Sequence, residues 1–469
     1  MTSERPPHTA PQDRPYGVTR RAVVLAGAAP GAALASVACA GRAPQGPQAA
    51  GRQVSGTVTY WHWGSQEYNE RERRIADAFQ EKFPAVTVET VNPGSLTEKL
   101  IAAFAGGTPP DTFAMDLQVV QMWGENDVLQ DLNDLIKKDP SYALGSYRTG
   151  PISKLMFEIM SYQGKLLAHP SETSPNVYFY NADLFRQAGL KTPYELWRED
   201  RWTWEAFVDA VLRLTKRGAD GSWEIVGASV GTGSNDNHLW IESAGGRPFD
   251  DFKKPTKCLY DEPPAIEGLQ FLQDLKYKHR GTPLNRFSAE VGMNEDQAFM
   301  AGRLALRSRW TTGIGLYKSI TSFTWGVVPY PKRKTYAYDY ATGGPTSTAM
   351  AKDTKVREAA WEWIKFKAGP EGLKVFALDG TGVPYHEEAQ KVLLDVHKSI
   401  PTFETPGLPV EILRQPYQFV RLLSKDQDKI WRDYINPELQ KIWNNEEGAA
   451  AAARRIAAAV NEFLKANPQ

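Results

Sequence analysis

The sequence predicts an α/β protein with two lobes, on three grounds. The chain has 469 residues, more than the about 100–200 residues of one typical core. Segments with the two-residue period of strands alternate with segments that have the helical period. A polar segment, residues 169–175, separates two strand-like runs, which suits a chain that leaves one α/β lobe and enters another.

The crossing between the lobes is predicted from its flanks. An apolar strand-like run, Leu166–Ala168, precedes it, and the β-branched and aromatic run Val177–Tyr180 follows it as a buried strand. A proline near each end of 169–175 fixes its own φ and biases the preceding residue toward extended backbone, so the crossing is stiff. Asn181 suits the N-cap of a following helix, and Gly189 suits the end of that helix.

The first lobe begins with strands that deliver polar and aromatic side chains to one edge. We expect strands at 56–64, 86–91 and 112–116, and helices at 67–83 and 96–104. Ligands of open α/β sheets bind beyond the carboxyl ends of the strands. Trp63 and Asp116 lie at such ends and are candidate ligand contacts. Asp116 also suits the N-cap of a helix at 117–123, and the two roles are compatible.

The second lobe repeats this alternation after the crossing. We expect strands at 225–230 and 325–331 and one that ends at Trp310, and helices at 203–214, 265–278, 295–300 and 446–464. A further helix is expected at 355–367, where the chain has returned to the first lobe. Thr203 suits the N-cap of the first of these helices. Trp240 has two interpretations, a core residue or a ring that faces a ligand, and both stay open.

Composition excludes several classes of function. Lys plus Arg and Asp plus Glu are equal at 55 each, so the chain lacks the basic surplus of a nucleic-acid-binding protein. The seven His are scattered, without an H-E-x-x-H or C-x-x-C motif, so we expect neither a metal site nor a cofactor. The only cysteines are Cys39 and Cys258. If Cys39 lies in a targeting segment, the folded part has no disulfide.

Residues 1–55 are predicted to be an export signal, a lipobox and a disordered tether. The pair Arg20 and Arg21 precedes an apolar run, 22–38, that is too short and too interrupted to span a membrane permanently. The arginine pair suggests the twin-arginine route. The run S-V-A-C resembles a lipobox and predicts lipidation of Cys39, with an ordinary cleavage site beside an incidental cysteine as the alternative. The Gly-, Pro- and Gln-rich residues that follow suit a tether.

Six motifs occur in order along residues 56–464. They are A-G-G-T-P-P-D-T-F at 105–113, the crossing with Y-F-Y-N-A-D-L-F-R-Q-A-G-L at 178–190, W-I-E-S-A-G-G at 240–246, A-F-M-A-G-R-L-A-L at 298–306, E-A-A-W-E-W-I-K-F at 358–366 and T-G-V-P at 381–384. Together they resemble the extracellular solute-binding proteins of ABC transporters, family 1, the sugar-binding kind. Leu304 and Leu306 depart conservatively from the residues that are commonest in the family.

The resemblance implies the two-lobe periplasmic-binding-protein fold, type II, with lobes joined by hinge crossings. It places the N-terminal lobe at 56–168 plus 346–398, and the C-terminal lobe at 174–343 plus 405–469. The second crossing is expected near Gly344 and the third near 399–406.

The resemblance also implies a ligand site at the crossings. Trp310 stands where family members stack a sugar on an aromatic ring, although a structural role is the alternative. Glu172 and Gly344 lie on the crossings, and Tyr417 stands at a late aromatic position of the family. With Trp63, Asp116 and Trp240, these are the predicted ligand-binding residues.

The expected function is the substrate-binding component of an ABC importer. Such a protein captures a mono- or oligosaccharide by hinge closure and delivers it to the membrane permease, without catalysis. We expect a monomer, lipid-anchored at the outer face of the cytoplasmic membrane. One alternative is an exported glycoside hydrolase, which needs two carboxylates about 5–9.5 Å apart, such as Asp116 and Glu172. The other is the same fold binding a non-sugar solute, such as a polyamine, a phosphate ester or a metal chelate.

Overall fold

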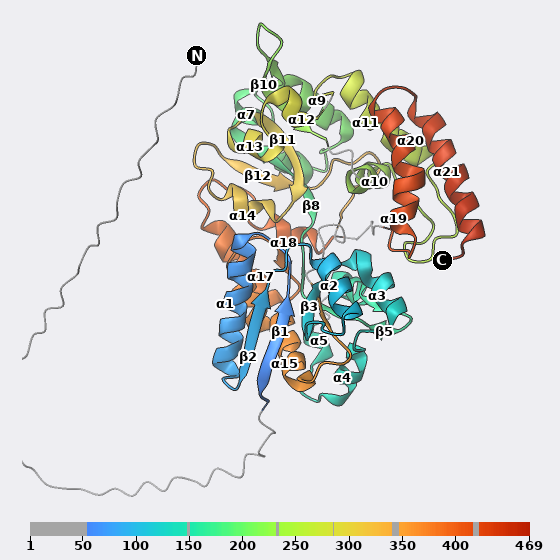
Figure 1. The fold of residues 1–469 in the computed structure, drawn as a ribbon. Helices are drawn as coiled ribbons and strands as arrows, with labels where there is room; N and C mark the ends of the chain where they lie inside the picture. Colours follow the sequence, from blue (N-terminus) through green and yellow to red (C-terminus); the bar gives the residue numbers. More distant parts are fainter. Residues whose placement is uncertain (1–53, 148–150, 231–233, 285, 340–346, 416–421) are drawn as a thin grey trace, which may run out of the picture. The chain divides into compact units, whose positions relative to one another are not determined.

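The computed structural model describes residues 54–147, 151–230, 234–284, 286–339, 347–415 and 422–469 (Figure 1). Residues Gln53–Gln469 form one compact unit. This unit contains two five-stranded sheets. We call the parts built on them the first lobe and the second lobe.

The first sheet has the strand order β2-β1-β3-β13-β6. β1 runs parallel to β2 and β3, whereas β13 is antiparallel to both β3 and β6. Its strands are β1 (Gly56–Trp61), β2 (Val86–Val91), β3 (Thr112–Met115), β6 (Ala168–Pro170) and β13 (Ser347–Met350). The helices of this lobe include α1 (Gln66–Lys82), α2 (Leu96–Ala105), α3 (Val120–Asn126), α6 (Pro151–Ile159), α15 (Arg357–Ala368), α16 (Pro370–Ala377) and α17 (Glu387–Lys398).

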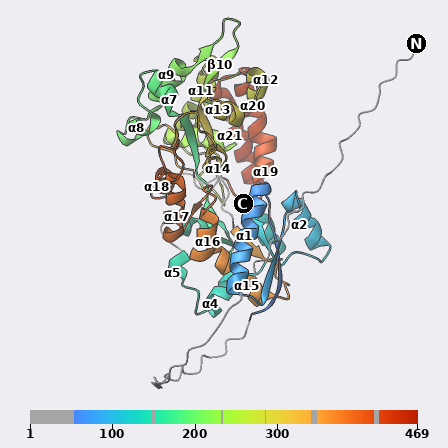
Figure 2. The same ribbon diagram turned by 90° about the vertical axis from the view of Figure 1, so that its left-hand side faces the viewer.

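Local sequence signals explain these elements. Ser65 caps α1 because its hydroxyl accepts a hydrogen bond from the N–H of Tyr68. The apolar stripe of α1, with Ile75 and Phe79, is buried. In β2 the first four residues, beginning at Val86, alternate between buried and exposed, as expected for a strand near a sheet edge. Figure 2 shows α1 and α15 beside the first sheet.

The second sheet has the strand order β12-β8-β11-β10-β9. Its strands are β8 (Asn176–Asn181), β9 (Lys216–Arg217), β10 (Trp223–Ser229), β11 (Leu304–Trp310) and β12 (Trp325–Val328). The helices of this lobe include α7 (Ala182–Gln187), α9 (Trp204–Leu214), α10 (Ser234–Ser243), α11 (Pro263–Tyr277), α13 (Glu295–Met300), α14 (Gly313–Tyr317), α19 (Gln427–Lys429), α20 (Asn436–Trp443) and α21 (Ala449–Ala466).

The inner strand β8, which lies between β12 and β11, is buried along its whole length, because both faces of the sheet are covered. On one face Tyr178 lies 5.2 Å from Phe207 of α9, measured between ring centroids. On the other face Phe179 lies 4.9 Å from Tyr317 of α14. This two-sided burial explains why the run reads as continuously apolar and aromatic.

The segment between β6 and β8 joins the two sheets and is held from both sides. Within it, β7 (Glu172–Thr173) pairs antiparallel with β14 (Val383–Pro384), which follows α16. At its far end, the N–H of Thr311 donates to the carbonyl of Pro175 at 2.9 Å. The crossing is therefore fastened to the first lobe by β14 and to the second lobe by the end of β11.

The segment near the third predicted crossing contacts β12. The N–H of Trp325 donates to the carbonyl of Thr402 at 2.8 Å, and the N–H of Glu404 donates to the carbonyl of Trp325 at 2.9 Å. The second predicted crossing, near Gly344, lies outside the described residues. The boundaries of the lobes along the chain stay predictions.

Most predicted elements agree with the structure, and the two N-caps at Asn181 and Thr203 are confirmed. The strand predicted at Leu166–Ala168 is divided, because Leu166 pairs back with Ser161 while Ala168 pairs with β13. The helix predicted at 117–123 begins as a 3₁₀ turn, Leu117–Val119, which α3 follows.

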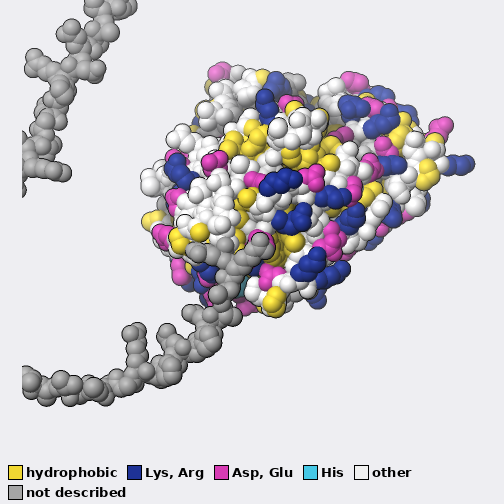
Figure 3. Space-filling model, turned by 60° about the horizontal axis from the view of Figure 1, so that its bottom comes forward, with side chains coloured by type: hydrophobic (Ala, Val, Ile, Leu, Met, Phe, Trp, Pro, Cys, Tyr) yellow, Lys and Arg dark blue, Asp and Glu magenta, His cyan; other side chains and the backbone are white. Residues whose placement is uncertain are grey.

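Charges of both signs are mixed on the surface. On the face seen in Figure 3, Lys and Arg side chains lie among Asp and Glu side chains. Over the described ranges, none of the helices combines the length and the hydropathy needed to cross a bilayer.

Candidate ligand-binding site at the crossing

Strand ends from both sheets meet at the crossing. In the first sheet Ser347, the first residue of β13, is paired with Met115 on one side and with Pro170 on the other. In the second sheet Trp310, the last residue of β11, is paired with Asn176, the first residue of β8. The residues that enter and leave the crossing are therefore flanked by the ends of strands from both lobes.

Trp310 is the most accessible of the predicted site residues in the described part of the chain. Its side chain is 39% exposed, whereas the strand that carries it is otherwise buried or half-buried. Because side chains alternate along a strand, Trp310 shares a face with Ser308. The indole ring thus stands at the carboxyl end of β11, beside the exit of the crossing.

Asp116 lies directly after β3 and caps the 3₁₀ turn that follows. One oxygen of its half-buried carboxylate accepts a hydrogen bond from the N–H of Gln118 at 2.9 Å. The backbone of Asp116 is extended, as an N-cap requires. The predicted N-cap role is confirmed, and the predicted ligand contact stays a prediction.

Trp63 is half-buried and packs against the core. The neighbouring ring of His62 is stacked between Tyr60, 5.6 Å away, and Tyr68, 5.9 Å away. Burial lowers the pKa of His62, which favours the neutral form of this ring. Gly64 has φ +129°, and a Cβ there would lie 2.4 Å from the ring of Tyr68, so only glycine fits this turn.

Glu172 lies in the crossing but belongs to a buried charge cluster of the first lobe. Its side chain is 5% exposed and interacts electrostatically with Arg71 and Lys367. In the same cluster the ammonium of Lys367 lies 2.6 Å from the carboxylate of Glu72, and Arg71 lies 3.3 Å from it. A Cβ at Gly382 would lie 2.4 Å from a carboxylate oxygen of Glu172, so a larger residue there would displace this carboxylate.

The remaining predicted residues do not meet at this place. Trp240 is fully buried in an aromatic cluster of the second lobe, where its nearest ring, Phe271, is 4.9 Å away. Gly344, Tyr417 and Cys39 lie outside the described residues. The structure therefore places Trp63, Asp116 and Trp310 at strand ends beside the crossing, Glu172 inside it, and Trp240 in the core.

Three buried polar residues at the two ends of the crossing were not predicted from the sequence. Within the described part of the chain, the side-chain oxygens of Asn176, Thr311 and Ser347 are buried and have no hydrogen-bond partner. Buried polar atoms are nearly always paired, so such atoms indicate a place for a polar ligand or ordered water. Asn176 and Ser347 open strands and Thr311 directly follows one, so their positions made them candidates, but the lack of partners for their oxygens depends on the assembled fold.

The cations near the end of β11 are neutralised. Arg307 lies 3.1 Å from the carboxylate of Asp296 and pairs with Glu295 as well, and Arg309 also pairs with Asp296. The hydroxyl of Tyr317 donates to Asp296 at 2.7 Å. The described residues contain no group of three or more His, Cys, Asp or Glu side chains placed to hold a metal ion.

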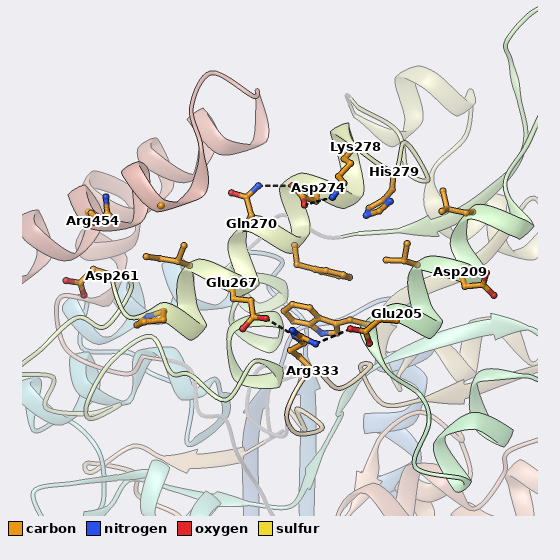
Figure 4. A pocket seen from close by; sticks show the side chains of 17 residues that line it. Glu205, Asp209, Asp261, Glu267, Gln270, Asp274, Lys278, His279, Arg333 and Arg454 are labelled. Atoms are coloured by element: carbon orange, nitrogen blue, oxygen red, sulfur yellow. Dashed lines mark hydrogen bonds and ion pairs between the residues drawn. The ribbon is translucent and has the colours of Figure 1, made fainter.

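A separate cavity of about 1080 Å³ lies on the second lobe, between α9 and α11 (Figure 4). Its floor is the stacked pair Trp204 and Phe271, whose ring centroids are 4.2 Å apart. At one end Arg333 bridges Glu205 at 3.1 Å and Glu267 at 2.7 Å. None of the predicted site residues that the structure describes lines this cavity.

Two solved structures resemble the fold. One is the ABC substrate-binding protein Lmo0181 from Listeria monocytogenes in complex with cycloalternan, with a TM-score of 0.72, 23% identity, and coverage of 88% of this chain and 99% of that chain. The other is UgpB from Mycobacterium tuberculosis in complex with glycerophosphocholine, with a TM-score of 0.69, 18% identity, and coverage of 88% and 99%. These likenesses establish the two-lobe architecture.

Sequence comparison establishes the family. The sn-glycerol-3-phosphate-binding periplasmic protein UgpB of Pectobacterium atrosepticum is 22% identical over 419 residues, which cover 85% of this chain and 89% of the relative. Residues 64–374 match the family described as bacterial extracellular solute-binding protein, and this match spans more than half of the chain. The chain therefore belongs to the bacterial extracellular solute-binding protein family.

Proposed function

We propose that this protein is the substrate-binding component of an ABC importer and that its ligand is a neutral mono- or oligosaccharide. The observation that carries the proposal is the exposed ring of Trp310 at the exit of the crossing. An indole face packs against the apolar C–H face of a pyranose, a contact of about 1–2 kcal/mol by analogy with other ring contacts.

The polar groups at the two ends of the crossing suit the hydroxyls of a sugar. Asn176, Thr311 and Ser347 offer buried oxygens without partners among the described residues. Hydroxyl and amide groups can both donate and accept, as sugar hydroxyls do. Asp116, at the end of β3, adds a carboxylate acceptor from the first lobe.

Capture proceeds by closure of the two lobes on the ligand. The crossing is short and fastened at both ends, so it acts as a hinge. The ligand shifts the population toward the closed form only by its higher affinity for that form. Contacts from both lobes, such as Trp310 and Asp116, supply this difference.

A phosphate ester is the second candidate, because two relatives point to it. The Pectobacterium protein is named for sn-glycerol 3-phosphate, and the Mycobacterium structure contains glycerophosphocholine. The charges favour a neutral ligand, since Arg307 and Arg309 are already paired with carboxylates. A phosphate would need a cation that these pairs do not leave available.

We propose that the ligand is released unchanged. Of the two carboxylates that a glycoside hydrolase would need, Asp116 caps a 3₁₀ turn and Glu172 is buried with Arg71 and Lys367. The proposed partners are the ligand and the transmembrane subunits of a permease, and the proposed state is a monomer. Export by the twin-arginine route and a lipid anchor at Cys39 would place the protein at the outer face of the membrane.

The test is a ligand panel measured by thermal shift and titration calorimetry. The panel contains neutral mono- and oligosaccharides, sn-glycerol 3-phosphate and glycerophosphocholine, and each mixture is analysed for cleavage by chromatography. We expect a neutral saccharide to raise Tm without turnover, because a ligand that binds only the folded state stabilises it. Binding of a phosphate ester with no saccharide bound would replace the proposed ligand class, and hydrolysis of a glycoside would overturn the proposal.

Two variants test whether the ligand binds at the crossing. Trp310→Ala should weaken saccharide binding about 5- to 30-fold, the equivalent of the lost ring contact. Leu212→Ala is the matched control, because Leu212 is also an exposed apolar residue of the second lobe but lines the separate cavity. If Leu212→Ala weakened binding and Trp310→Ala did not, the ligand would bind in that cavity and not at the crossing.

A further inference from the structure

Two side chains of the second lobe reach the backbone of the first lobe at places other than the crossing. Lys253 donates from its ammonium to the carbonyls of Glu158 and Ser161, the latter at 3.3 Å. Gln427 donates from its amide nitrogen to the carbonyl of Gln118 at 2.7 Å. We call these two side chains the interlobe pair.

The segment that carries Lys253 is fixed to the second lobe. The N–H of Cys258 donates to the side chain of Asn461 in α21 at 2.7 Å. The N–H of Leu423, a few residues before Gln427, donates to the carbonyl of Phe252 at 2.7 Å. The two members of the interlobe pair are therefore mounted on segments that bond to each other.

The loop around Lys253 is held in shape by two carboxylates. The side chain of Asp251 accepts from the N–H groups of Lys253 and Lys254, both at 2.7 Å. The side chain of Asp250 accepts from the N–H of Thr256 at 2.9 Å. Because these turns fix the backbone, the ammonium of Lys253 is presented with little further loss of conformational entropy.

The acceptors in the first lobe suit these donors. Glu158 lies in the last turn of α6, where unpaired carbonyls and the helix dipole favour a cation. Gln118 belongs to the 3₁₀ turn that Asp116 caps, since its N–H donates to the Asp116 carboxylate at 2.9 Å. The bond from Gln427 therefore fixes the turn that sets the orientation of Asp116.

We infer that Lys253 and Gln427 are positioning residues that hold the two lobes in the arrangement that binds ligand. This inference rests on the proposed function, in which the ligand is captured between the lobes. It makes ligand affinity depend on two side chains that lie outside the proposed ligand contacts. A bond that forms only when the lobes are together shifts the population toward the closed form, and a ligand for that form then binds more tightly.

The first arm of the test needs no ligand. Spin labels are placed at Lys99→Cys in α2 and Lys216→Cys in β9, both exposed, in a Cys39→Ser background. Cys258 can remain, because it is buried and burial raises the pKa of its thiol to about 12. Pulsed electron resonance then measures the distance between the lobes.

In this background Lys253→Met should shift the distance distribution to longer values, because methionine keeps the apolar stem but cannot donate. Lys253→Arg, which keeps a cationic donor, should restore it. Lys254→Met is the matched control, since Lys254 is exposed and its side chain forms no hydrogen bond or ion pair with the described part of the first lobe. Gln427→Leu should act in the same direction as Lys253→Met. A distribution that is unchanged in both variants would overturn the inference.

The second arm measures affinity with the saccharide of the panel that binds, using cycloalternan as the first probe. We expect Lys253→Met to raise Kd about 10-fold or more and Gln427→Leu about 2- to 10-fold, the usual range for bonds to charged and neutral groups. An unchanged Kd in both variants overturns the inference and leaves the proposed function standing. If no saccharide binds, the proposed function fails, and the distance measurement alone decides whether the interlobe pair holds the lobes.

Discussion

Asp116 has an observed role in the fold and a proposed role in the ligand site. It caps the turn after β3 through Gln118, and that turn is held from the second lobe by Gln427. A side chain fixed in this way has little freedom left to lose when a ligand binds. The two roles can be separated by substitution, because an asparagine caps as well as an aspartate.

We expect Asp116→Asn to keep the stability of the protein and to weaken ligand binding, since the charged acceptor is lost while the cap remains. Asp116→Ala should lose both the charged acceptor and the cap, with weaker ligand binding and a decrease of about 0.5–2 kcal/mol in the free energy of unfolding. Urea unfolding and calorimetric titration of the two variants check this. Equal stability of the Asn and Ala variants would show that the cap contributes nothing.

The burial of single side chains could not be predicted from the sequence. Trp240 and Trp310 were both candidate ligand contacts, yet one is fully buried and the other is 39% exposed. The difference arises from the packing of α10 on the second sheet and from the position of Trp310 at a strand end. The buried oxygens of Asn176 and Ser347 were missed for the same reason, because their lack of partners is a property of the assembled fold.

At the scale of elements, α10 carries a carboxyl group whose charge opposes folding. Glu242 is 8% exposed, and burial raises its pKa to about 8, against a lowering by Arg247. The folded protein thus holds a proton on Glu242 over a pH range in which the unfolded chain has released it. The unfolded state gains by ionisation as the pH rises from about 4.5 to about 8, so this group lowers stability progressively over that range.

We therefore expect Glu242→Gln to become more stable relative to the unchanged protein as the pH rises, by at most about 1.4 kcal/mol per pH unit in this range. Urea unfolding at pH 5, 6.5 and 8 measures the difference. The comparison must be with the unchanged protein, because buried His62 and His397 have lowered pKa values and act in the opposite direction. Glu98→Gln, an exposed change on α2, is the control. A difference that is the same at all three pH values contradicts the assignment.

Elements with strong local signals were predictable, and elements that depend on distant partners were not. The strand Val86–Val91 agrees with its prediction, and α1 and α13 agree to within a residue, because periodicity and caps are local. The short strands β7 and β14 were not predicted. Each has two residues and exists only because the other pairs with it across about 210 positions of sequence.

At the scale of the whole molecule, the proposed lipid anchor makes attachment to the membrane independent of ligand binding. Cys39→Ser should move the protein from the membrane fraction to the soluble fraction of the cell envelope or medium, because a protein without its acyl chains loses most of its membrane affinity. Fractionation and mass spectrometry of the mature N-terminus check this. Ligand affinity of the purified variant should be unchanged, and a variant that stays with the membrane would contradict lipidation at this residue.

The order of strands in the first sheet has a consequence for biosynthesis. β13, at residues 347–350, lies between β3 and β6, so the sheet stays incomplete until three quarters of the chain has left the ribosome. The second sheet, whose last strand ends at Val328, can assemble earlier. The segment 402–404, which forms hydrogen bonds with Trp325 of β12, is synthesised later. A nascent chain that stops before residue 347 therefore exposes the flanks of β3 and β6 as open edges, which are sites of aggregation and of chaperone binding.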